Sequence, residues 1–231
     1  MFDVVSSSSW PTGYLIKESI EPLDPKWLRE FQHIPASAVS DCLGRNLGGL
    51  GLKPYHGNSL LLGSALTVRV RPGDNLMILK AIQMANPGDV LVIDGSADLT
   101  RAVFGGIMRA MAIKAGIVGV VINGAIRDLD EWASGDLPVY AIGVVHRGPS
   151  TDGGGEINVP VSCAGMLVNP GDLITGDVDG VVAARRDELP ELLARCHALL
   201  ERERSTLEAI EAGTLDPARF DALLRAKGCP I

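Results

Sequence analysis

Short runs of β-branched residues alternate with helix-like segments through the middle of the chain, and this alternation most constrains its fold. The strand-like runs are VLVID at 90–94, VGVVI at 118–122 and PVYAI at 138–142. A helical segment from about Leu99 to Ala115 separates the first two runs, and a short helix after Arg127 separates the next two. Such alternation is typical of parallel strands joined by crossover helices. The sequence therefore predicts an α/β fold.

Other strand and helix signals flank this central part. The segment LLGSALTVRVR at 61–71 alternates apolar and polar residues, which is the period of a half-buried strand. Asp179-Gly180 lies between two β-branched runs and indicates a β-hairpin. Helical spacing of apolar residues occurs at 24–34, 35–45, 72–89, 187–213 and 216–228. The fold therefore combines an α/β part with antiparallel strands and has additional helices at both ends.

The length and composition are those of one globular unit. With 231 residues, of which 46% are hydrophobic and 21% charged, the chain can bury a sizeable core. We expect a single domain over residues 1–231, with a polar leader at 1–23 and C-terminal helices at 187–231. No internal repeat or long linker divides the sequence.

The charge and the cysteines bear on partners and location. A net charge of -7 argues against nucleic-acid binding, which needs a clustered surplus of Lys and Arg. The four cysteines lack CxxC spacing and suit a reducing compartment. The N-terminus has no signal-peptide pattern, and no stretch approaches the 18 apolar residues of a membrane span. We therefore expect a cytoplasmic protein with no nucleic-acid or membrane partner.

The segment FGGIMRAMAIKAGIVGVVINGAIRD at 104–128 begins with a candidate anion-binding turn. Gly105 and Gly106 precede a helix, and helix N-termini present unpaired N–H groups and a partial positive charge. Glycine lets an anion approach this backbone closely. The alternative is that two small residues only permit close packing, because short glycine patterns are unspecific.

The same segment ends with an Arg-Asp pair. Arg127 and Asp128 follow a strand that reads as buried, at the carboxyl end where α/β sheets bind ligands. Arg can hold a carboxylate through two parallel hydrogen bonds, and Asp offers hard oxygen to Mg²⁺ or Mn²⁺. The alternative is a structural ion pair at a helix N-terminus. The histidines show no HxxH or HExxH spacing, so we expect no zinc site.

Six motifs occur in order: PGDVLVIDG, FGGIM, AGIVGVVINGAIRD, PVYAIG, CAGMLVNPGD and GDVDGVV. Together they resemble the RraA-like family, which includes the 4-hydroxy-4-methyl-2-oxoglutarate/4-carboxy-4-hydroxy-2-oxoadipate aldolases and the regulators of RNase E activity. The likeness covers roughly residues 30–205, and INGAIRD with NPGD and DxDGVV is its most specific part. The resemblance implies a swivelling β/β/α domain, here with extra N- and C-terminal helices.

The resemblance also implies roles for individual residues. In the aldolases of this family, backbone at a glycine turn and an Arg hold the pyruvyl part of the substrate, and the next Asp anchors a divalent metal. The matching backbone is that of Gly105, Gly106, Ile107 and Met108. Arg127 and Asp128 match the catalytic pair, with Arg127 binding substrate and Asp128 binding Mg²⁺ or Mn²⁺.

Assembly is a further implication of the resemblance. Members of the family form trimers or pairs of trimers, so we expect a homotrimer or hexamer with the site near a subunit interface. An acidic residue from a neighbour's C-terminal region can complete the site. Glu201 and Glu203 are the candidates for it here.

One position departs from the family pattern. The aldolases carry a further carboxylate, followed by twenty residues and then Arg-Asp, and in this chain Gly106 stands at that position. Such a carboxylate helps to hold metal-bound water for proton transfer. Asp94 and Asp98 lie upstream and are candidates to replace it in space.

The function we expect is that of a metal-dependent lyase-type enzyme acting on a small 2-oxo acid. It would cleave a 4-hydroxy-2-oxo acid to release pyruvate, and would also decarboxylate oxaloacetate through the same enolate. The alternative is a non-catalytic RraA-like protein that binds a partner such as a ribonuclease. Gly106 favours the alternative, whereas Arg127 and Asp128 favour the enzyme.

Overall fold

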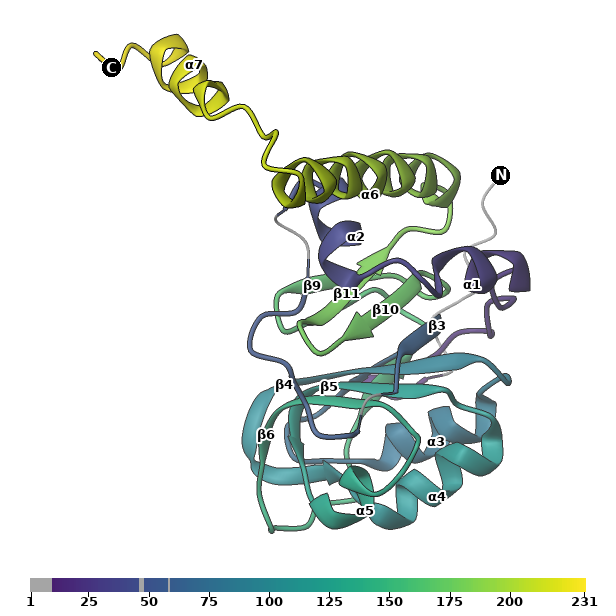
Figure 1. The fold of residues 1–231 in the computed structure, drawn as a ribbon. Helices are drawn as coiled ribbons and strands as arrows, with labels where there is room; N and C mark the ends of the chain where they lie inside the picture. The colour runs from purple at the N-terminus through teal and green to yellow at the C-terminus, as the bar shows by residue number, and fades with distance from the viewer. Residues whose placement is uncertain (1–9, 46–47, 58) are drawn as a thin grey trace.

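A mixed β-sheet lies at the centre of the protein in the computed structural model, which describes residues 10–45, 48–57 and 59–231 (Figure 1). Its main strands are β3 (Leu61–Val70), β4 (Asp89–Phe104), β5 (Gly119–Ile126) and β6 (Val139–Val144). Each is parallel to the next. These four strands and the helices between them confirm the predicted α/β fold.

Shorter strands extend this sheet. The order along it is β1-β7-β3-β4-β5-β6-β2, and β10 pairs with both β3 and β11. A separate two-stranded sheet is formed by β8 and β9. The bounds are β1 (Tyr14–Ile16), β2 (Lys53–Pro54), β7 (Gly155–Ile157), β8 (Val161–Cys163), β9 (Met166–Val168), β10 (Leu173–Asp177) and β11 (Gly180–Ala184).

The predicted hairpin and leader can be located in this sheet. Strands β10 and β11 form the hairpin, in which Asp177 pairs with Gly180. Gly180 has a φ of 144°, a value that favours glycine. Within the expected leader at 1–23, β1 pairs with β7, and residues 1–9 lie outside the described ranges.

Three helices pack below the sheet in the view of Figure 1. They are α3 (Leu76–Met84), α4 (Gly106–Ala115) and α5 (Leu129–Ala133). Their apolar sides form one buried cluster with β3, β4, β5 and β6, which includes Ile78, Phe104, Ile122 and Trp132. Burial of such side chains contributes about 1.5–3 kcal/mol each relative to leaving them exposed, so this core holds α4 and α5 firmly against the strand ends.

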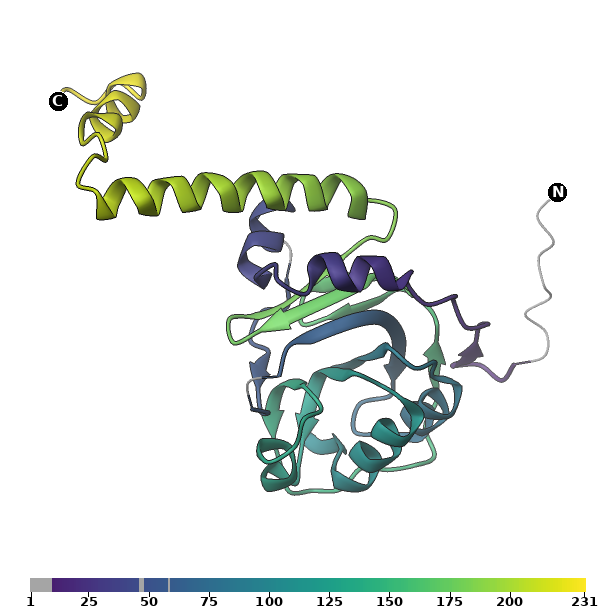
Figure 2. The same cartoon turned by 45° about the vertical axis from the view of Figure 1, so that its right-hand side comes forward.

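A second helical layer covers the opposite side, over β10 and β11 (Figures 1 and 2). It consists of α1 (Pro25–Phe31), α2 (Ala36–Cys42) and the long helix α6 (Leu189–Glu211). Phe31, Val39, Leu192 and Cys196 are buried at its centre. The N- and C-terminal helices expected from the sequence are therefore present.

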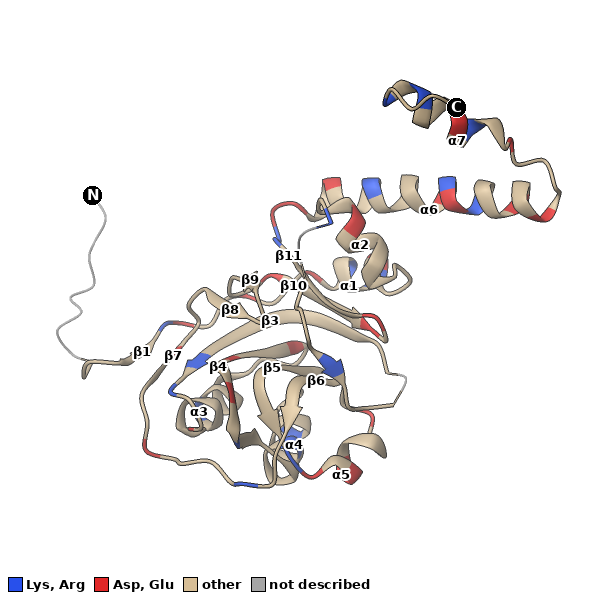
Figure 3. Cartoon of the chain, turned by 90° about the vertical axis from the view of Figure 1, so that its left-hand side faces the viewer, with Lys and Arg blue, Asp and Glu red and all other residues tan. Residues whose placement is uncertain are grey.

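The outer surface of α6 carries charges of both signs (Figure 3). Arg204 forms ion pairs with Glu201 and Glu208, each one turn away along the helix. Beyond α6, the last helix α7 (Ala218–Ala226) projects away from the body of the molecule (Figures 1 and 2) and has no buried residue. Within the described ranges, no helix is both long enough and apolar enough to cross a bilayer.

The expected helix start at about Leu99 is wrong. Strand β4 continues to Phe104, and α4 begins only at Gly106. After Asp94 the pairing of β4 with β5 is irregular, but Ala102 and Phe104 still pair with residues of β5. Ala102 and Phe104 are buried, so pairing and burial on the sheet outweigh the helix-like spacing of this segment.

Candidate active site

Two adjacent parallel strands end at the same edge of the sheet and bring the glycine pair next to the Arg-Asp pair. Strand β4 ends at Phe104, just before Gly105, and β5 ends at Ile126, just before Arg127. The N–H of Arg127 donates to the carbonyl oxygen of Phe104 at 3.1 Å. The carboxyl ends of parallel strands are where ligands bind in α/β sheets, so the predicted residues gather at a suitable edge.

Glycine at 105 permits the close approach of the two segments. A Cβ at Gly105 would lie 2.5 Å from Oδ2 of Asp128 and 3.1 Å from Nε of Arg127. Gly105 has a φ of -150°, which is extended backbone that any residue adopts. Glycine is therefore required at position 105 because a larger residue would not fit, as the close-packing alternative proposed. The atoms that occupy this space belong to Arg127 and Asp128, the predicted ligand-binding pair.

The Asp128 carboxylate is oriented by the backbone of α4. Its Oδ2 accepts a hydrogen bond from the N–H of Gly106 at 2.8 Å. Asp128 itself has a φ of 62° and a ψ of 50°, a left-handed conformation that Asp and Asn tolerate better than most residues. The turn places the carboxylate over the N-terminus of α4, where the helix dipole favours a negative charge.

Helix α5 anchors the Arg-Asp corner in the core. The indole Nε1 of Trp132 donates to the carbonyl oxygen of Arg127 at 3.0 Å. Trp132 is fully buried and packs on Phe104 with a ring-centroid distance of 5.8 Å. One large side chain thus fixes both the backbone of Arg127 and the end of β4.

A cavity of about 220 Å³ opens in front of this corner. All the residues expected to bind substrate line it, namely Gly105, Gly106, Ile107, Met108 and Arg127. The amides of Ile107 and Met108 occupy the first helical turn, where N–H groups have no partner within the helix. The structure brings these residues together, and their role in binding stays a prediction.

Arg127 and Asp128 also form the ion pair that was the alternative interpretation of their sequence, although the contact between them is long. Nε of Arg127 lies 3.6 Å from Oδ2 of Asp128, and each side chain is 40% exposed. An exposed pair at this distance contributes little to stability. The guanidinium group therefore remains accessible to an anion in the cavity.

Asp74, which the sequence reasoning missed, holds the loop that follows the cavity residue Pro149. Its side chain is 1% exposed, and its Oδ2 accepts hydrogen bonds from Ser150 Oγ at 2.7 Å, Asp152 N at 3.0 Å and Gly153 N at 2.9 Å. Burial acts to raise the pKa of Asp74, but these bonds and one from the amide of Leu76 lower it overall. The ionised carboxylate thus pins the loop at 150–153.

Asn75 is a second residue that the sequence reasoning missed. It lines the cavity together with Leu79 and Pro149. Its Oδ1 accepts a hydrogen bond from Thr151 Oγ1 at 2.8 Å, and its Nδ2 lies 3.4 Å from Sδ of Met108. The only signal for Asp74 and Asn75 in the sequence is their position before a helix start.

A third missed residue is Glu131, in the first turn of α5. The Glu131 side-chain Cδ and Oε1 lie 2.5 Å from the point that a Cβ of Gly106 would occupy. Glu131 is exposed, and its carboxylate has no hydrogen bond or ion pair with the described residues. The Glu131 carboxylate lies on the side of the backbone to which a side chain at position 106 would point. The space beside Gly106 is therefore filled by a carboxylate from another helix, α5.

Few side chains near Asp128 could hold a divalent metal. Within the described ranges, no three His, Cys, Asp or Glu side chains come together as a metal-binding group. Asp128 and Glu131 both approach Gly106, and Mg²⁺ is commonly held by one or two carboxylates while it keeps several waters. A divalent ion would therefore have to be held mainly by Asp128 and by water, and metal binding stays a prediction.

The other acidic candidates have different surroundings. Asp94 pairs with Arg69 at 3.8 Å, and Asp98 accepts a hydrogen bond from the N–H of Thr100 at 3.0 Å. Glu201 and Glu203 lie on α6, on the opposite side of the sheet from α4 and α5 (Figure 1). A contribution from Glu201 or Glu203 therefore requires a neighbouring subunit, and stays a prediction.

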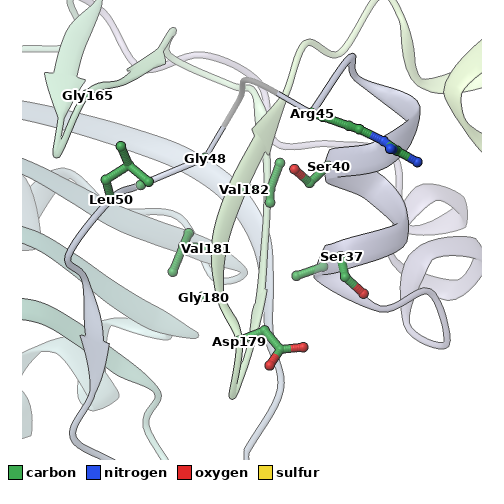
Figure 4. A pocket seen from close by; sticks show the side chains of 12 residues that line it. Ser37, Ser40, Arg45, Gly48, Leu50, Gly165, Asp179, Gly180, Val181 and Val182 are labelled. Carbon is green, nitrogen blue, oxygen red and sulfur yellow. The ribbon is translucent and has the colours of Figure 1, made fainter. Parts of the chain in front are cut away.

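A larger cavity, of about 500 Å³, lies between α2 and β11 (Figure 4). Its charged lining residues are Arg45 and Asp179, and Arg45 pairs with Asp41 at 3.2 Å. This cavity belongs to the α6 side of the sheet, away from Arg127. The smaller cavity, rather than this one, gathers the residues predicted from the sequence.

Comparisons with known proteins identify similar sequences. The family model described as RraA-like, Aldolase/RraA, matches residues 36–183. The chain is 40% identical over 171 residues to a protein of Halalkalibacterium halodurans named a putative 4-hydroxy-4-methyl-2-oxoglutarate aldolase, which covers 73% of this chain and 81% of the relative.

Solved structures share the fold. An uncharacterized protein from Pseudomonas syringae pv. tomato is 28% identical, with a TM-score of 0.74 over 84% of this chain and 96% of that one. The RNA-processing inhibitor RraA from Thermus thermophilis is also 28% identical, with a TM-score of 0.60 over 65% of this chain and 92% of that one. The family-model match and the aldolase-named relative show that the chain belongs to the RraA-like family.

Proposed function

We propose that this protein is a cytoplasmic lyase-type enzyme that cleaves a 4-hydroxy-2-oxo acid and releases pyruvate. The observation that carries the proposal is that Arg127 and the N-terminal residues of α4 line one small cavity, with the Asp128 carboxylate bonded to the amide of the cavity residue Gly106. The aldolase name of the Halalkalibacterium relative supports a lyase. Fold alone would not decide the matter, because one fold hosts several functions.

The chain's own groups suit a 2-oxo acid. The accessible guanidinium of Arg127 offers two parallel N–H donors to the substrate carboxylate. The amides of Ile107 and Met108 face an anion or a polarised oxygen at the positive end of α4. The N–H donors of Arg127, Ile107 and Met108 are already in position before the substrate binds. They therefore stabilise the negative charge that develops on the pyruvyl part of the substrate.

Asp128 is the proposed ligand for Mg²⁺ or Mn²⁺. When bound, such an ion supplies a Lewis acid that polarises the keto oxygen and favours negative charge on it. The N–H of Gly106 holds Oδ2 of Asp128 at 2.8 Å, which sets the direction of the carboxylate and leaves Oδ1 for the cation.

The proposed reaction balances without an oxidant or a second substrate. The 4-hydroxyl group loses its proton, the C3–C4 bond breaks, and a carbonyl forms at C4. The electron pair of the broken bond forms the enolate of pyruvate, which takes a proton at C3. Loss of CO2 from oxaloacetate yields the same enolate, so we also propose oxaloacetate decarboxylation.

The test is a pyruvate-release assay with a panel of 4-hydroxy-2-oxo acids and oxaloacetate. Each substrate is assayed with Mg²⁺, with Mn²⁺ and with chelator. We expect release of pyruvate from at least one hydroxy acid, with activity that the chelator removes and the metal restores. If no substrate yields pyruvate and the purified protein inhibits a ribonuclease, the enzyme proposal is rejected in favour of the non-catalytic alternative.

A further inference from the structure

We propose that Glu131 is the catalytic carboxylate that transfers the proton in this reaction. The inference rests on the proposed function, because it assigns a residue to that same site. The carboxylate lies where the backbone of α4 carries no side chain, at Gly106. Four features of the structure carry the assignment.

The first feature is the position of the carboxylate. Glu131 lies three residues after Asp128, and its N–H donates to the carbonyl oxygen of Asp128 at 3.1 Å. This single helical turn directs the side chain back toward α4. The Glu131 carboxylate fills the space that a Cβ of Gly106 would occupy, next to the amide that binds Asp128.

The second feature is the reason for glycine at 106. Gly106 is the first residue of α4 and is absent from the glycines that have positive φ. Its backbone conformation therefore suits any residue. Space is the remaining requirement at this position, and the group that uses the space is the Glu131 carboxylate.

The third feature is the rigid support of α5. Trp132 follows Glu131 directly, is fully buried, and donates to the carbonyl oxygen of Arg127. The Arg109 guanidinium lies over the Trp132 ring, 5.8 Å from its centroid. A Cβ at Gly135 would overlap the Arg109 guanidinium, so this glycine makes room for the stacked cation. Helix α5 is thereby held next to α4 by the Trp132 and Arg109 side chains.

The fourth feature is the availability of the carboxylate. The structure shows no hydrogen bond or ion pair between the side-chain carboxylate of Glu131 and the residues it describes. A carboxylate without a fixed partner can accept a proton from substrate, and a base must lie within hydrogen-bond reach of that proton. A purely structural cap of α4 would instead bind the helix amides.

These features define the step. The Glu131 carboxylate accepts the proton of the substrate's 4-hydroxyl group as the C3–C4 bond breaks and the electron pair moves into the pyruvate enolate. The carboxylic acid then returns this proton to C3. Pyruvate and the C4 carbonyl product leave, and Glu131 is again ionised.

The first test compares Glu131→Gln with Asp130→Asn. Both substitutions remove one exposed charge from α5, but only Glu131 approaches Gly106. Pyruvate release is measured with the substrate that wild type cleaves, and methyl-proton exchange of pyruvate in D2O is followed by NMR. We expect Glu131→Gln to lower kcat and the exchange rate by about 10²-fold or more, with KM changed by less than about threefold. We expect Asp130→Asn to match wild type.

The second test moves the carboxylate to the other helix. In Glu131→Ala the space beside Gly106 is empty, so Gly106→Asp placed in that variant restores a carboxylate there. We expect the double variant to regain at least about tenfold in kcat over Glu131→Ala. Gly106→Asp alone should not exceed wild type, because the new side chain and Glu131 compete for one space and repel each other.

The outcomes separate the two proposals. If wild type releases pyruvate and Glu131→Gln matches Asp130→Asn, the role of Glu131 is overturned while the proposed function stands. If wild type neither releases pyruvate nor exchanges its methyl protons, the proposed function fails and the role of Glu131 fails with it. Calorimetric Mg²⁺ binding and the unfolding midpoint of each variant are measured in parallel. If the kcat loss in Glu131→Gln is explained by lost Mg²⁺ binding or lost folding and the double variant does not recover, the proton-transfer role is overturned.

Discussion

The N–H of Gly106 donates a hydrogen bond of 2.8 Å to Oδ2 of Asp128, and so joins the first residue of α4 to the residue that precedes α5. Gly106 and Asp128 are 22 residues apart in the chain. They meet because β4 and β5 are parallel neighbours that end at one edge of the sheet. The bond orients the carboxylate through the backbone, so the structural role of Asp128 and its proposed metal-binding role can be tested separately.

Asp128→Asn and Asp128→Ala are expected to differ in stability but not in metal binding. Asn keeps an oxygen acceptor for the Gly106 amide and tolerates a φ of 62°, whereas Ala loses the acceptor and adds strain. We expect Ala, but not Asn, to lower the free energy of unfolding by about 1–2 kcal/mol. Both should lose calorimetric Mg²⁺ binding. Wild-type Mg²⁺ affinity in Asp128→Asn would remove Asp128 from the metal site.

Arg127→Lys should impair catalysis although the positive charge is kept. Lys lacks the planar pair of donors that matches a carboxylate, and loss of a charge-assisted hydrogen bond costs about 1.5–3 kcal/mol. We therefore expect kcat/KM to fall roughly 10- to 100-fold. Arg185→Lys is the control, because Arg185 also forms an Arg-Asp pair, with Asp187 at 2.6 Å, beside α6. Equal kinetics in the two variants would exclude Arg127 from substrate binding.

Asp89 should make the protein less stable as pH rises through the weakly acidic range. Its side chain is buried, with the residue 5% exposed, and burial raises its pKa from 3.8 to about 6 although bonds from Asn86 oppose the rise. Between these values the folded protein binds a proton that the unfolded chain has lost, so stability falls with increasing pH. Relative to Asp89→Asn, wild type should lose roughly 2–3 kcal/mol between pH 4 and 6.5.

Urea unfolding at intervals of pH measures this difference. Asp89→Asn serves as the reference because it retains an acceptor for the Asn86 amide, which donates to Asp89 Oδ2 at 2.7 Å, but cannot ionise. Parallel curves for the two proteins over this range would show that Asp89 has its ordinary pKa in the folded state.

Self-association is expected, with α7 as a contact between copies of the chain. Phe220 and Leu223 on α7 are 52% and 59% exposed, and this helix buries no residue within its own chain. We expect light scattering to give the mass of a homotrimer or hexamer, and Phe220→Ser with Leu223→Ser to lower it. Asp221→Asn on the same helix is the control. A stable wild-type monomer at micromolar concentration would contradict the prediction.

The sequence by itself determined the order of the main elements and the location of the Arg-Asp pair. The β-branched runs around Val92, Val120 and Val139 became parallel strands, because such side chains favour buried sheet and their spacing is a local property. The left-to-right order of motifs also sufficed to predict the RraA-like family. Position after a buried strand was enough to expect Arg127 and Asp128 at a ligand-binding edge.

Only the tertiary structure decided how distant segments meet. The continuation of β4 to Phe104 depends on pairing with β5, and helix-like spacing cannot reveal that pairing. In the same way, the sequence shows a missing carboxylate at Gly106, but not that Glu131 from another helix fills the space. Asp74 likewise depends on a loop 76 to 79 residues away. Local periodicity and capping depend on residues that are close in the sequence and can be recognised there. These contacts form only when the packing of Trp132 and the strand ends brings distant segments together.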